Sequence, residues 1–414
     1  MKKLNVGVIG IGGRGLWLTK LLCNMASEPE FKNMLAVAAV CDLHFERAAA
    51  AVRAVNEILG YEPKLFTEED SFFDCAGLDA AIIATSWETH APLAVKAMRR
   101  GIRPGLECGG ASSLEQCFEL VRVSEETRVP CMFLENCNYG REEMALQNMC
   151  EQGVFGELIH MQCGYQHDLR DYLAGCYESG HFRLAHHIHR NAELYPMHGL
   201  GPMMKMLKIN EGNRITTLVS VSSKARGINE YAKNNYAEDH PLRTENVSQG
   251  DVVNTFLKCQ NGETVLITHD STLPRPYSRA GRVQGTKGIW MEDNRSIHIE
   301  GMSPPEAWEP FDGFVERNGF EHPVWKEYLS SGVKEGHGGM DYLVVREFVR
   351  SAISGAEPPI GVYDAALFMS VTPLSARSIS LGSHPVEVPD FTNGKYMKLN
   401  ESGIKTAAVR DVKY

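Results

Sequence analysis

A glycine pattern near the amino terminus restricts the fold of this chain more than any other feature. Gly10, Gly12 and Gly15 form G-x-G-x-x-G directly after the apolar run LNVGVI and directly before a helical run. In that context the glycines let the backbone approach a pyrophosphate, and the helix N-terminus offers N–H groups and partial positive charge. The alternative is a glycine turn that only joins strand to helix. The flanking strand and helix favour a dinucleotide-binding loop.

The first third of the chain repeats this strand-then-helix pattern. Its apolar runs are LNVGVI, LAVAAVC, LDAAIIAT, IRPGLE and PCMFLE, and the helical runs between them cover residues 16–23, 45–59, 91–100 and 114–128. Short strands that alternate with longer helices are typical of a parallel sheet with crossover helices. We therefore predict an α/β fold in which residues 1–138 form a Rossmann domain with a doubly wound parallel sheet.

The pattern changes after about residue 141, where strands come in adjacent pairs. TFLKCQNGETVLITHD predicts a hairpin with a type I′ turn at Asn261-Gly262, and GRVQGTKGIWMED predicts another. The other expected elements are helices at 142–152, 340–352 and 362–376 and long loops at 168–209 and 302–339. Residues 139–414 are thus expected to form an α+β domain for substrate binding and oligomerisation, with a mainly antiparallel sheet and a C-terminal tail.

The bulk composition restricts the class of protein and its partners. A chain of 414 residues exceeds one ordinary core, and a hydrophobic share of 43% with a charged share of 23% is typical of soluble globular proteins. The net charge of -10 and the lack of basic runs argue against nucleic acid or an anionic membrane as the main partner. No apolar run is long enough to span a bilayer. A small-molecule ligand fits better.

The cysteines and the start of the chain bear on its compartment. Eleven cysteines occur without any C-x-x-C pair, which predicts reduced thiols in a cytoplasmic protein. The opening MKKLNVGVIGIGGRG has two lysines before an apolar run, as a secretion signal does, but glycines interrupt that run early. We expect the mature chain to start at or near Met1.

The end of the second expected strand indicates which dinucleotide binds. LAVAAVCD ends in Asp42, a position from which a carboxylate accepts hydrogen bonds from a ribose diol. This favours NAD over NADP. The alternative is that Arg14 or Arg47 meets the 2′-phosphate of NADP.

Polar residues at the ends of later strands are further candidates to line the cofactor. Trp87, Thr89 and His90 follow one strand, and Glu107, Cys108 and Asn136 end the next two. In such sheets ligands lie outside the carboxyl ends of the strands. His90 has an alternative role as the cap of a helix that begins at Ala91. Cys108 has no partnering base evident in the sequence, so we interpret it as a small packing residue rather than a nucleophile.

The segment ELYPMHGLGP contains two side chains that can transfer protons. It places Tyr195 and His198 three residues apart across Pro196, which stiffens the segment so that phenol and imidazole can face one ligand. The alternative is a packed, hydrogen-bonded turn. The nearby HFRLAHHIHR concentrates histidines, but chelation usually needs one-face spacing and a further ligand, so we predict no metal.

The two expected domains together resemble the oxidoreductase family that includes glucose-fructose oxidoreductase and inositol dehydrogenase. That family typically has Glu-Lys-Pro after its fifth strand and an Asp-x-x-x-His pair in the second domain. Here the first motif reads Glu107-Cys108-Gly109, and Leu194 stands four residues before His198. The usual lysine and aspartate are absent, and an ordinary alcohol dehydrogenation needs a group that takes the hydroxyl proton.

Other segments of the chain indicate a more specific family in which the usual lysine and aspartate are not expected. LENCNYGREE, YQHDLR, RNAELYPMHGLGP, HDSTLPRPYSR, QGTKGI, GHGGMD and PDFTNGK together resemble the NAD-dependent glycoside hydrolases of family 109, the α-N-acetylgalactosaminidase group, over nearly the whole chain. The resemblance implies cofactor-binding roles for Arg14, Gly15, Asp42, Trp87, Glu88, Thr89, His90, Glu107, Cys108 and Asn136. It implies sugar-binding roles for Tyr165, Arg183, Tyr195, Pro196, Met197, His198 and Tyr277. Met197 stands where the family usually has threonine.

The resemblance also implies a reaction. NAD-dependent glycosidases are an exception to the use of two carboxylates. Oxidation at sugar C3 acidifies the C2 proton, a base removes it, the substituent at C1 leaves, water adds and C3 is reduced again. We expect His198 near O3 and Tyr195 at C2, although the reverse assignment stays open, with His167 as a further acid and with Arg183 and Tyr277 orienting the sugar.

Several alternatives remain open at this stage. The rivals are a dehydrogenase that forms 3-keto sugars and a non-catalytic NAD-binding protein. The sugar and its anomer are not specified, and both α- and β-linkages are compatible with the route. His337 in GHGGMD is either a ligand contact or part of a hinge or helix start. A homo-oligomer is expected by analogy with the family.

Overall fold

The computed structural model describes residues 3–334, 336–399 and 405–406. The chain divides into two compact units: Met1–Asn136 with Lys334–Met369, and Cys137–Val333 with Ser370–Tyr414. The expected boundary at residue 138 lies close to the first crossing between the units. The expectation differs in residues 334–369, which it places in the second domain.

A helix near the carboxyl end explains this difference. Helix α13 (Met340–Ser354) packs on the sheet of the first unit, where the ring of Phe348 would meet a Cβ added at Gly105. Its Tyr342 hydroxyl donates a hydrogen bond of 2.6 Å to Glu28. Helical periodicity in the sequence predicts such a helix but does not say which sheet it covers.

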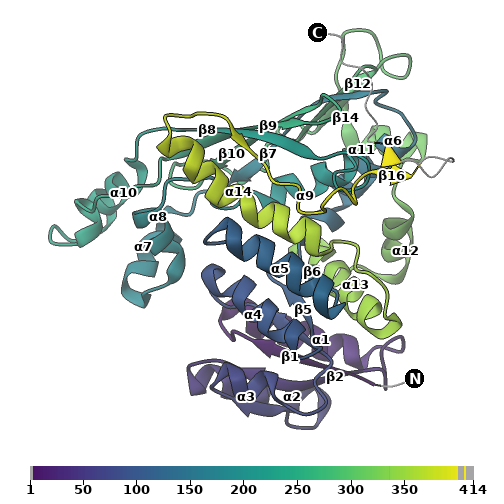
Figure 1. Cartoon of the computed structure of the whole chain (residues 1–414). Coiled ribbons are helices and arrows are strands. Elements are labelled where there is room, and N and C mark those ends of the chain that lie inside the picture. Colours follow the sequence, from purple (N-terminus) through teal and green to yellow (C-terminus); the bar gives the residue numbers. More distant parts are fainter. Residues whose placement is uncertain (1–2, 335, 400–404, 407–414) are drawn as a thin grey trace. The chain divides into compact units, whose positions relative to one another are not determined.

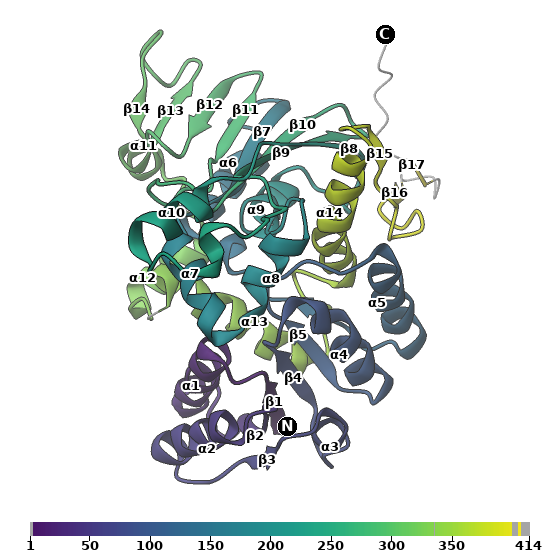
Figure 2. The same cartoon turned by 90° about the vertical axis from the view of Figure 1, so that its left-hand side faces the viewer.

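The first unit is a doubly wound Rossmann domain, as expected. Its six strands lie in the order β3-β2-β1-β4-β5-β6, and all its strand pairs are parallel. They are β1 (Leu4–Ile9), β2 (Leu35–Cys41), β3 (Lys64–Phe66), β4 (Ala80–Ile83), β5 (Arg103–Leu106) and β6 (Met132–Phe133). The helices are α1 (Gly13–Ser27), α2 (Phe45–Leu59), α3 (Glu69–Phe73), α4 (Trp87–Arg99) and α5 (Leu114–Thr127). Figure 2 shows α1 and α2 on one face of the sheet and α4 and α5 on the other.

The second unit is built on a nine-stranded, mainly antiparallel sheet, which confirms the expected fold class. The strand order is β14-β13-β12-β11-β7-β10-β9-β8-β15, and the pair β7–β10 is parallel. The strands are β7 (Leu158–Gln166), β8 (Ile215–Ser222), β9 (Val252–Cys259), β10 (Thr264–Asp270), β11 (Arg282–Gly285), β12 (Gly288–Met291), β13 (Ser296–Ile299), β14 (Glu309–Pro310) and β15 (Val386–Glu387). A separate pair, β16 (Lys398–Leu399) and β17 (Lys405–Thr406), lies outside this sheet.

Both expected hairpins are present, but one turn type was wrong. Strands β9 and β10 pair antiparallel, as do β11 and β12. A type I′ turn needs positive φ at both central residues, whereas Gly262 has a φ of 109° and Asn261 is not at positive φ. The loop between β9 and β10 is four residues long, from 260 to 263, so the two-residue turn geometry does not apply.

The two expected long loops are largely helical, and this expectation was wrong. The first region holds α7 (Arg170–Ser179), α8 (Phe182–His189) and α9 (Met197–Met206), and the second holds α11 (Phe311–Asn318) and α12 (Pro323–Ser331). Helices this short depend on tertiary packing more than on propensity, and each spans only about two to three turns, which is too short for the sequence pattern to be distinguished from a loop. The remaining helices are α6 (Arg141–Glu151), α10 (Gly227–Asn235) and α14 (Val362–Ser380), with 3-10 turns η1 (Asn136–Tyr139), η2 (Pro241–Arg243) and η3 (His337–Gly339). Figure 1 labels most of these elements.

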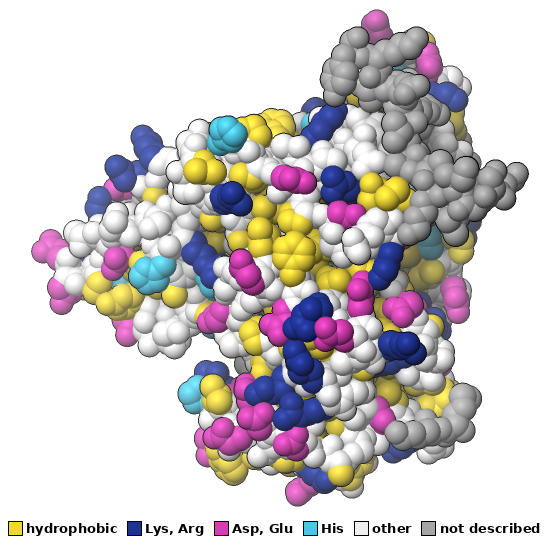
Figure 3. Space-filling model, in the orientation of Figure 1, with side chains coloured by type: hydrophobic (Ala, Val, Ile, Leu, Met, Phe, Trp, Pro, Cys, Tyr) yellow, Lys and Arg dark blue, Asp and Glu magenta, His cyan; other side chains and the backbone are white. Residues whose placement is uncertain are grey.

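Charged side chains of both signs share the surface of the first unit. Over α4, Arg100 pairs with Asp74 at 2.6 Å and Arg99 pairs with Glu119 at 3.4 Å. On the face shown in Figure 3, dark blue and magenta side chains accordingly lie side by side. Among the described residues, none of the helices has both the length and the apolar character that crossing a bilayer requires.

Candidate functional site

The glycine loop of the first unit leaves open space at one of its three motif positions. Gly10 has a φ of +89°, and a Cβ there would lie 2.7 Å from the backbone of Ala84. A Cβ on Gly15 would lie 1.9 Å from the carbonyl oxygen of Gly10. Among the described residues, none other than the chain neighbours of Gly12 has an atom within 4 Å of a Cβ added there. Gly10 and Gly15 are therefore required by the protein itself, and Gly12 borders free space, as a loop that admits a pyrophosphate should.

The start of α1 and Asp42 complete this loop. Gly12 is the N-cap of α1 and has no side chain to satisfy the first N–H groups of the helix, which remain for an anion. The Asp42 carboxylate accepts hydrogen bonds from the backbone N–H of Ile11 at 2.7 Å and of His44 at 2.9 Å. A carboxylate has about four acceptor sites, so Asp42 can hold the loop and still accept from ribose hydroxyls. These residues fit NAD.

Helix α4 begins at Trp87, four residues before the expected start. Trp87, Glu88, Thr89 and His90 therefore form its first turn, after the extended residue Ser86. His90 is buried and its Nε2 lies 3.1 Å from the carbonyl oxygen of Thr85. Burial lowers the pKa of His90, so the neutral ring donates from Nε2 to that carbonyl. His90 thus fixes the β4–α4 loop and does not cap a helix that begins at Ala91.

Gly109 explains one departure from the oxidoreductase pattern. A Cβ at this position would lie 2.4 Å from the Trp87 ring and 3.1 Å from Nδ1 of His90. A proline in the Glu-Lys-Pro motif carries such a Cβ. The first turn of α4 therefore occupies the space that the usual motif needs, and glycine fits beside it.

Arg14 is committed to two carboxylates of its own unit. Its guanidinium lies 2.9 Å from Glu107 and 2.8 Å from Asp341. These ion pairs place two residues expected at the cofactor, Arg14 and Glu107, in direct contact. Because the Arg14 cation already has two carboxylate partners inside the protein, these ion pairs do not favour binding of the 2′-phosphate of NADP by Arg14.

Asp341 is the centre of this network, and the sequence reasoning did not single it out. It also accepts hydrogen bonds from Asn136 Nδ2 and His337 Nδ1, both at 2.7 Å. Burial by itself would raise the pKa of the Asp341 carboxyl, but the bonds from His337 and Arg14 hold it well below its ordinary value. The motif GHGGMD, which ends in Asp341, contained the signal, but the sequence interpretation considered only its His337.

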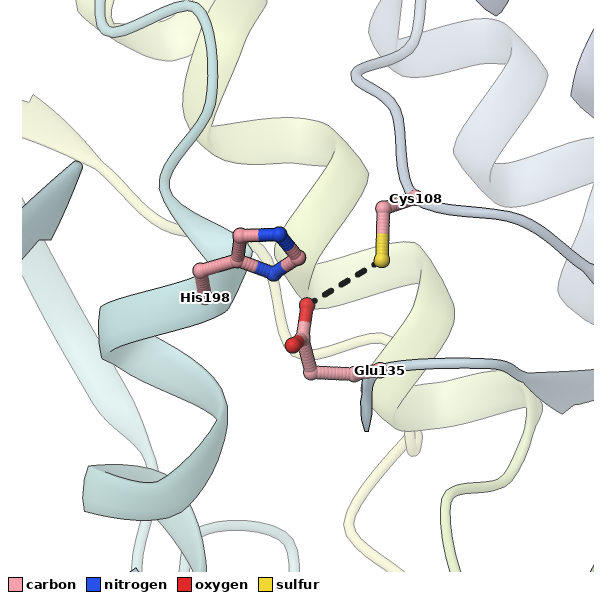
Figure 4. A group of neighbouring side chains, drawn as sticks. All are labelled: Cys108, Glu135 and His198. Atoms are coloured by element: carbon pink, nitrogen blue, oxygen red, sulfur yellow. Dashed lines mark hydrogen bonds between the residues drawn. The ribbon is translucent and has the colours of Figure 1, made fainter. Parts of the chain in front are cut away.

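Cys108 has an acidic partner that the sequence reasoning also missed. Its Sγ donates a hydrogen bond of 3.2 Å to Oε2 of Glu135, and both residues are buried (Figure 4). Glu135 follows β6 and precedes Asn136. The rule that found Asn136, that ligands lie beyond strand ends, was therefore sufficient to find Glu135.

In the second unit, three predicted residues form one aromatic cluster. Tyr165 lies near the end of β7, Tyr195 precedes α9, and His198 is in the first turn of α9. The ring centroids are 4.8 Å apart for Tyr165 and Tyr195 and 4.8 Å apart for Tyr195 and His198. The Tyr165 and His198 rings are 5.8 Å apart. Two phenols and an imidazole thus lie in mutual contact, and such groups transfer protons.

His167 and Tyr277 join this cluster from one side. Nδ1 of His167 is 3.0 Å from the Tyr165 hydroxyl, and the His167 and Tyr277 ring centroids are 5.1 Å apart. Burial, and then the charge of Arg183, lower the pKa of His167. The imidazole is therefore neutral at neutral pH and can exchange a proton with Tyr165.

Arg183 supplies a cation to the cluster. Its guanidinium carbon lies 5.3 Å from the ring centre of Tyr195 and 5.6 Å from that of Tyr172. A neighbouring cation favours the phenolate form of a tyrosine. Tyr172, half exposed on α7, was not predicted from sequence, where it carries no motif.

The start of α9 positions His198. Pro196 is the N-cap residue with a φ of −72°, and Met197 is the buried first residue of the helix. A Cβ added at Gly199 would lie 2.4 Å from the backbone nitrogen of Gly164 on β7. Glycine at these two positions lets the helix lie directly on the strand, which brings His198 to Tyr165. This part of the long loop expected at 168–209 is thus the first turn of a helix.

Comparison with known proteins extends over both units. The chain matches the model of the glycosyl hydrolase 109 C-terminal domain over residues 139–398, and that of the oxidoreductase family NAD-binding Rossmann fold over residues 4–134. It is 40% identical to a glycosyl hydrolase family 109 protein of Stenotrophomonas maltophilia, covering 95% of this chain and 90% of that protein. It is 36% identical to an α-N-acetylgalactosaminidase of Tannerella forsythia, covering 87% and 82%.

Solved structures with the same fold are more distant in sequence. A levoglucosan dehydrogenase in complex with NADH and levoglucosan superposes with a TM-score of 0.71 at 17% identity, covering 94% of this chain and 100% of that chain. This likeness shows the fold. The Rossmann match together with the glycine loop and Asp42 identifies the first unit as an NAD-binding domain.

Proposed function

Because this chain belongs to glycosyl hydrolase family 109, we propose that it is an NAD-dependent glycosidase that cleaves terminal α-N-acetylgalactosaminides or related hexosides by transient oxidation at sugar C3. The observation that carries the proposal is the cluster of Tyr165, Tyr195 and His198. It holds proton-transfer groups in the domain that defines the family, while the first unit carries the loop for NAD.

NAD, when bound, supplies reversible two-electron oxidation at C3 of the sugar. The remaining steps are proton transfers and bond changes that the second unit can serve. His198 takes the proton of the C3 hydroxyl as the ketone forms. The ketone acidifies the C2–H bond, and Tyr195 removes that proton, since the Arg183 cation beside its ring favours the phenolate. The C1–O bond then breaks.

The second half of the proposed reaction reverses these transfers. As the C1–O bond breaks, Nε2–H of His167 gives its proton to the departing oxygen while Nδ1 of the same ring takes the proton of the Tyr165 hydroxyl. A water molecule then adds its oxygen to C1 of the unsaturated sugar, and the proton that it loses returns through His167 to Tyr165. Tyr195 returns a proton to C2, and His198 returns one to the C3 oxygen as the ketone is reduced. Arg183 and Tyr277 orient the sugar, and no net oxidation results.

The reaction is tested with a panel of nitrophenyl glycosides. The expected result is release of nitrophenol without stoichiometric NADH, and loss of that release when the cofactor is removed. Accumulation of NADH without nitrophenol would instead identify a sugar dehydrogenase. Turnover unaffected by replacing both Tyr195 and His198 would point to a protein without catalysis at this cluster.

We also propose a reducing cytoplasmic compartment and a homo-oligomer. The eleven cysteines all lie within the described residues and none of them forms a disulfide, which suits a reducing compartment. One face of the large sheet carries Val219, Phe256 and Leu266 side by side in register, and Phe256 is 50% exposed. A second copy of the chain would cover this row. Analytical ultracentrifugation tests this, since Phe256→Lys should yield monomers if the face is the interface.

A further inference from the structure

A chain of buried polar side chains runs behind Tyr165 and Tyr195. Nδ1 of His269 lies 3.5 Å from Oε1 of Glu193, and Nε2 of His269 lies 3.1 Å from the hydroxyl of Ser271. That hydroxyl is 3.0 Å from Nε2 of His187. None of the four side chains is more than 2% exposed. Buried polar groups of this kind are costly unless each hydrogen bond has a donor and an acceptor.

Each end of the chain holds a residue of the proposed site. At one end the backbone N–H of Tyr195 donates to Oε1 of Glu193 at 3.2 Å. At the other end Nδ1 of His187 lies 2.9 Å from the carbonyl oxygen of Arg183. The Arg183 guanidinium in turn lies beside the Tyr195 ring. The buried chain thus connects the backbones of two residues whose side chains meet.

The backbone carbonyl of Arg183 determines which atom donates in each hydrogen bond from His187 to His269. A carbonyl only accepts, so His187 must carry its proton on Nδ1. Burial, and then the charge of His269, lower the pKa of His187 to about 3, which leaves Nε2 without a proton. The Ser271 hydroxyl therefore donates to His187, and its oxygen accepts from Nε2–H of His269.

One proton then remains between His269 and Glu193. With Nε2 protonated, a neutral His269 would turn a bare Nδ1 toward the carboxylate, and two lone pairs would face each other. Oε1 of Glu193 already accepts from the Tyr195 N–H, as a carboxylate oxygen does. We therefore place a proton on Nδ1 of His269, facing Oε1 of Glu193.

Two aromatic rings also lie next to His269. The Tyr165 ring is stacked against it at 6.2 Å with an interplanar angle of 28°, and the His187 ring lies at 6.1 Å. Tyr165 thus rests on the imidazole while it contacts Tyr195 and His198.

We propose that Glu193, His269, Ser271 and His187 form a proton-ordered chain that positions Tyr195 and Arg183 for the reaction proposed above. The four are positioning residues, since each acts through the backbone or ring of a residue in the cluster. The proposal rests on the proposed function for its catalytic consequence, but the proton order is a property of the protein by itself.

The proton order is tested by ¹⁵N spectroscopy of the histidine side chains in the full chain with NAD bound. Spectra of His187→Asn and His269→Asn assign the two rings. At neutral pH we expect His187 as the neutral Nδ1–H tautomer and His269 with both nitrogens protonated. In Glu193→Gln, His269 should become neutral with its proton on Nε2, because the glutamine amide donates to Nδ1. A proton on Nε2 of His187, or a His269 unchanged in Glu193→Gln, would overturn the assignment.

The positioning role is tested by nitrophenyl glycoside turnover. Ser271→Ala interrupts the chain without changing its charge and should lower kcat about tenfold, since small displacements near a reacting group have effects of this size or larger. Glu193→Ala and Glu193→Gln should do the same, because neither keeps an acceptor for the Tyr195 N–H at the position that faces His269. The matched control is Ser220→Ala, which deletes a buried hydroxyl that bonds to Thr255 elsewhere in the same sheet.

The outcomes separate the two proposals. Equal kcat values for Ser271→Ala and Ser220→Ala would refute the positioning role, provided that both variants keep their melting temperature. Wild-type protein without activity on any glycoside would refute the proposed function, and the ¹⁵N spectra would still decide the proton order.

Discussion

The two units build their candidate sites from different parts of the chain. The cofactor loop of the first unit is made by backbone within a short stretch, where Gly10, Gly12 and Gly15 determine which atoms can approach. The cluster of the second unit is made by side chains that lie far apart in the sequence, such as Tyr165, Tyr195 and Tyr277. Local sequence therefore specifies the first site, whereas the second depends on how strands and short helices pack.

The largest expected effect comes from removing side chains in the second unit. Tyr195→Phe and His198→Ala should each lower kcat by about 10³-fold, the usual size for loss of an acid–base group. NAD affinity should stay unchanged, because the loop for NAD belongs to the first unit. Steady-state kinetics with calorimetric NAD binding measures both, and a kcat near that of the wild type would remove Tyr195 or His198 from the proposed chemistry.

Glycine replacements in the first unit test whether the backbone of the glycine loop leaves space for the cofactor. Gly15→Ala should destabilise the protein by about 3 kcal/mol, since its Cβ overlaps a carbonyl oxygen. Gly12→Ala should leave the melting temperature of the NAD-free protein unchanged, because no protein atom lies near its Cβ, and should weaken NAD binding. Thermal unfolding with and without NAD separates the two variants. Equal loss of stability in both would mean that the loop does not leave space for a ligand.

A smaller effect is expected at the carboxylate that holds Arg14. Asp341→Asn should cost about 2 kcal/mol, because it leaves the cation without one of its carboxylates. The folded-state pKa of Asp341 lies below its unfolded value, so its stabilisation is complete above the unfolded pKa of about 4 and is lost as pH falls toward the folded one. Acid denaturation of the wild type should therefore be steeper below pH ~4 than that of the variant. Parallel curves would contradict the assignment.

The last effect concerns His187 in the second unit and is expected as a change in the pH dependence of stability. Its folded-state pKa of about 3 lies below the ordinary value of about 6.5, so the unfolded chain binds one more proton between these values. The wild type should lose up to about 1.4 kcal/mol of stability per pH unit as pH falls below ~6.5 from this group. His187→Asn keeps a donor to the Arg183 carbonyl and should remove that slope. Urea unfolding from pH 4.5 to 7.5 measures it, with His384→Asn, a change at an exposed histidine, as the control.

The first unit could be predicted in most respects from sequence because its signals are local. Each strand that was expected there is present, and Phe45–Leu59 was predicted to the residue as helix α2. The strand β3 was missed, since three residues carry too little periodicity. The contribution of α13 was missed because its partner, the sheet strand with Gly105, lies far away in the sequence.

The second unit was predicted less well for the same physical reason. Its hairpins follow from alternation and turn residues, but α7, α8 and α9 were expected as loop. The packing of Gly199 on Gly164 decides where His198 lies, and no local pattern shows such a contact. Family resemblance named Tyr165 and Arg183. Glu193 and His269 stand at the start of the segments ELYPMHGLGP and HDSTLPRPYSR, but only the fold brings two residues so far apart in the sequence together.

The central claim is that a proton leaves C2 of the sugar during glycoside cleavage, and hydrolysis in deuterated water tests it most directly. The NAD-loaded protein is incubated with a nitrophenyl glycoside in D₂O, and the released sugar is analysed by NMR. The account predicts deuterium at C2 of the product, with no label there in a cofactor-free sample because cleavage stops. Product formed at full rate with only protium at C2 would contradict it.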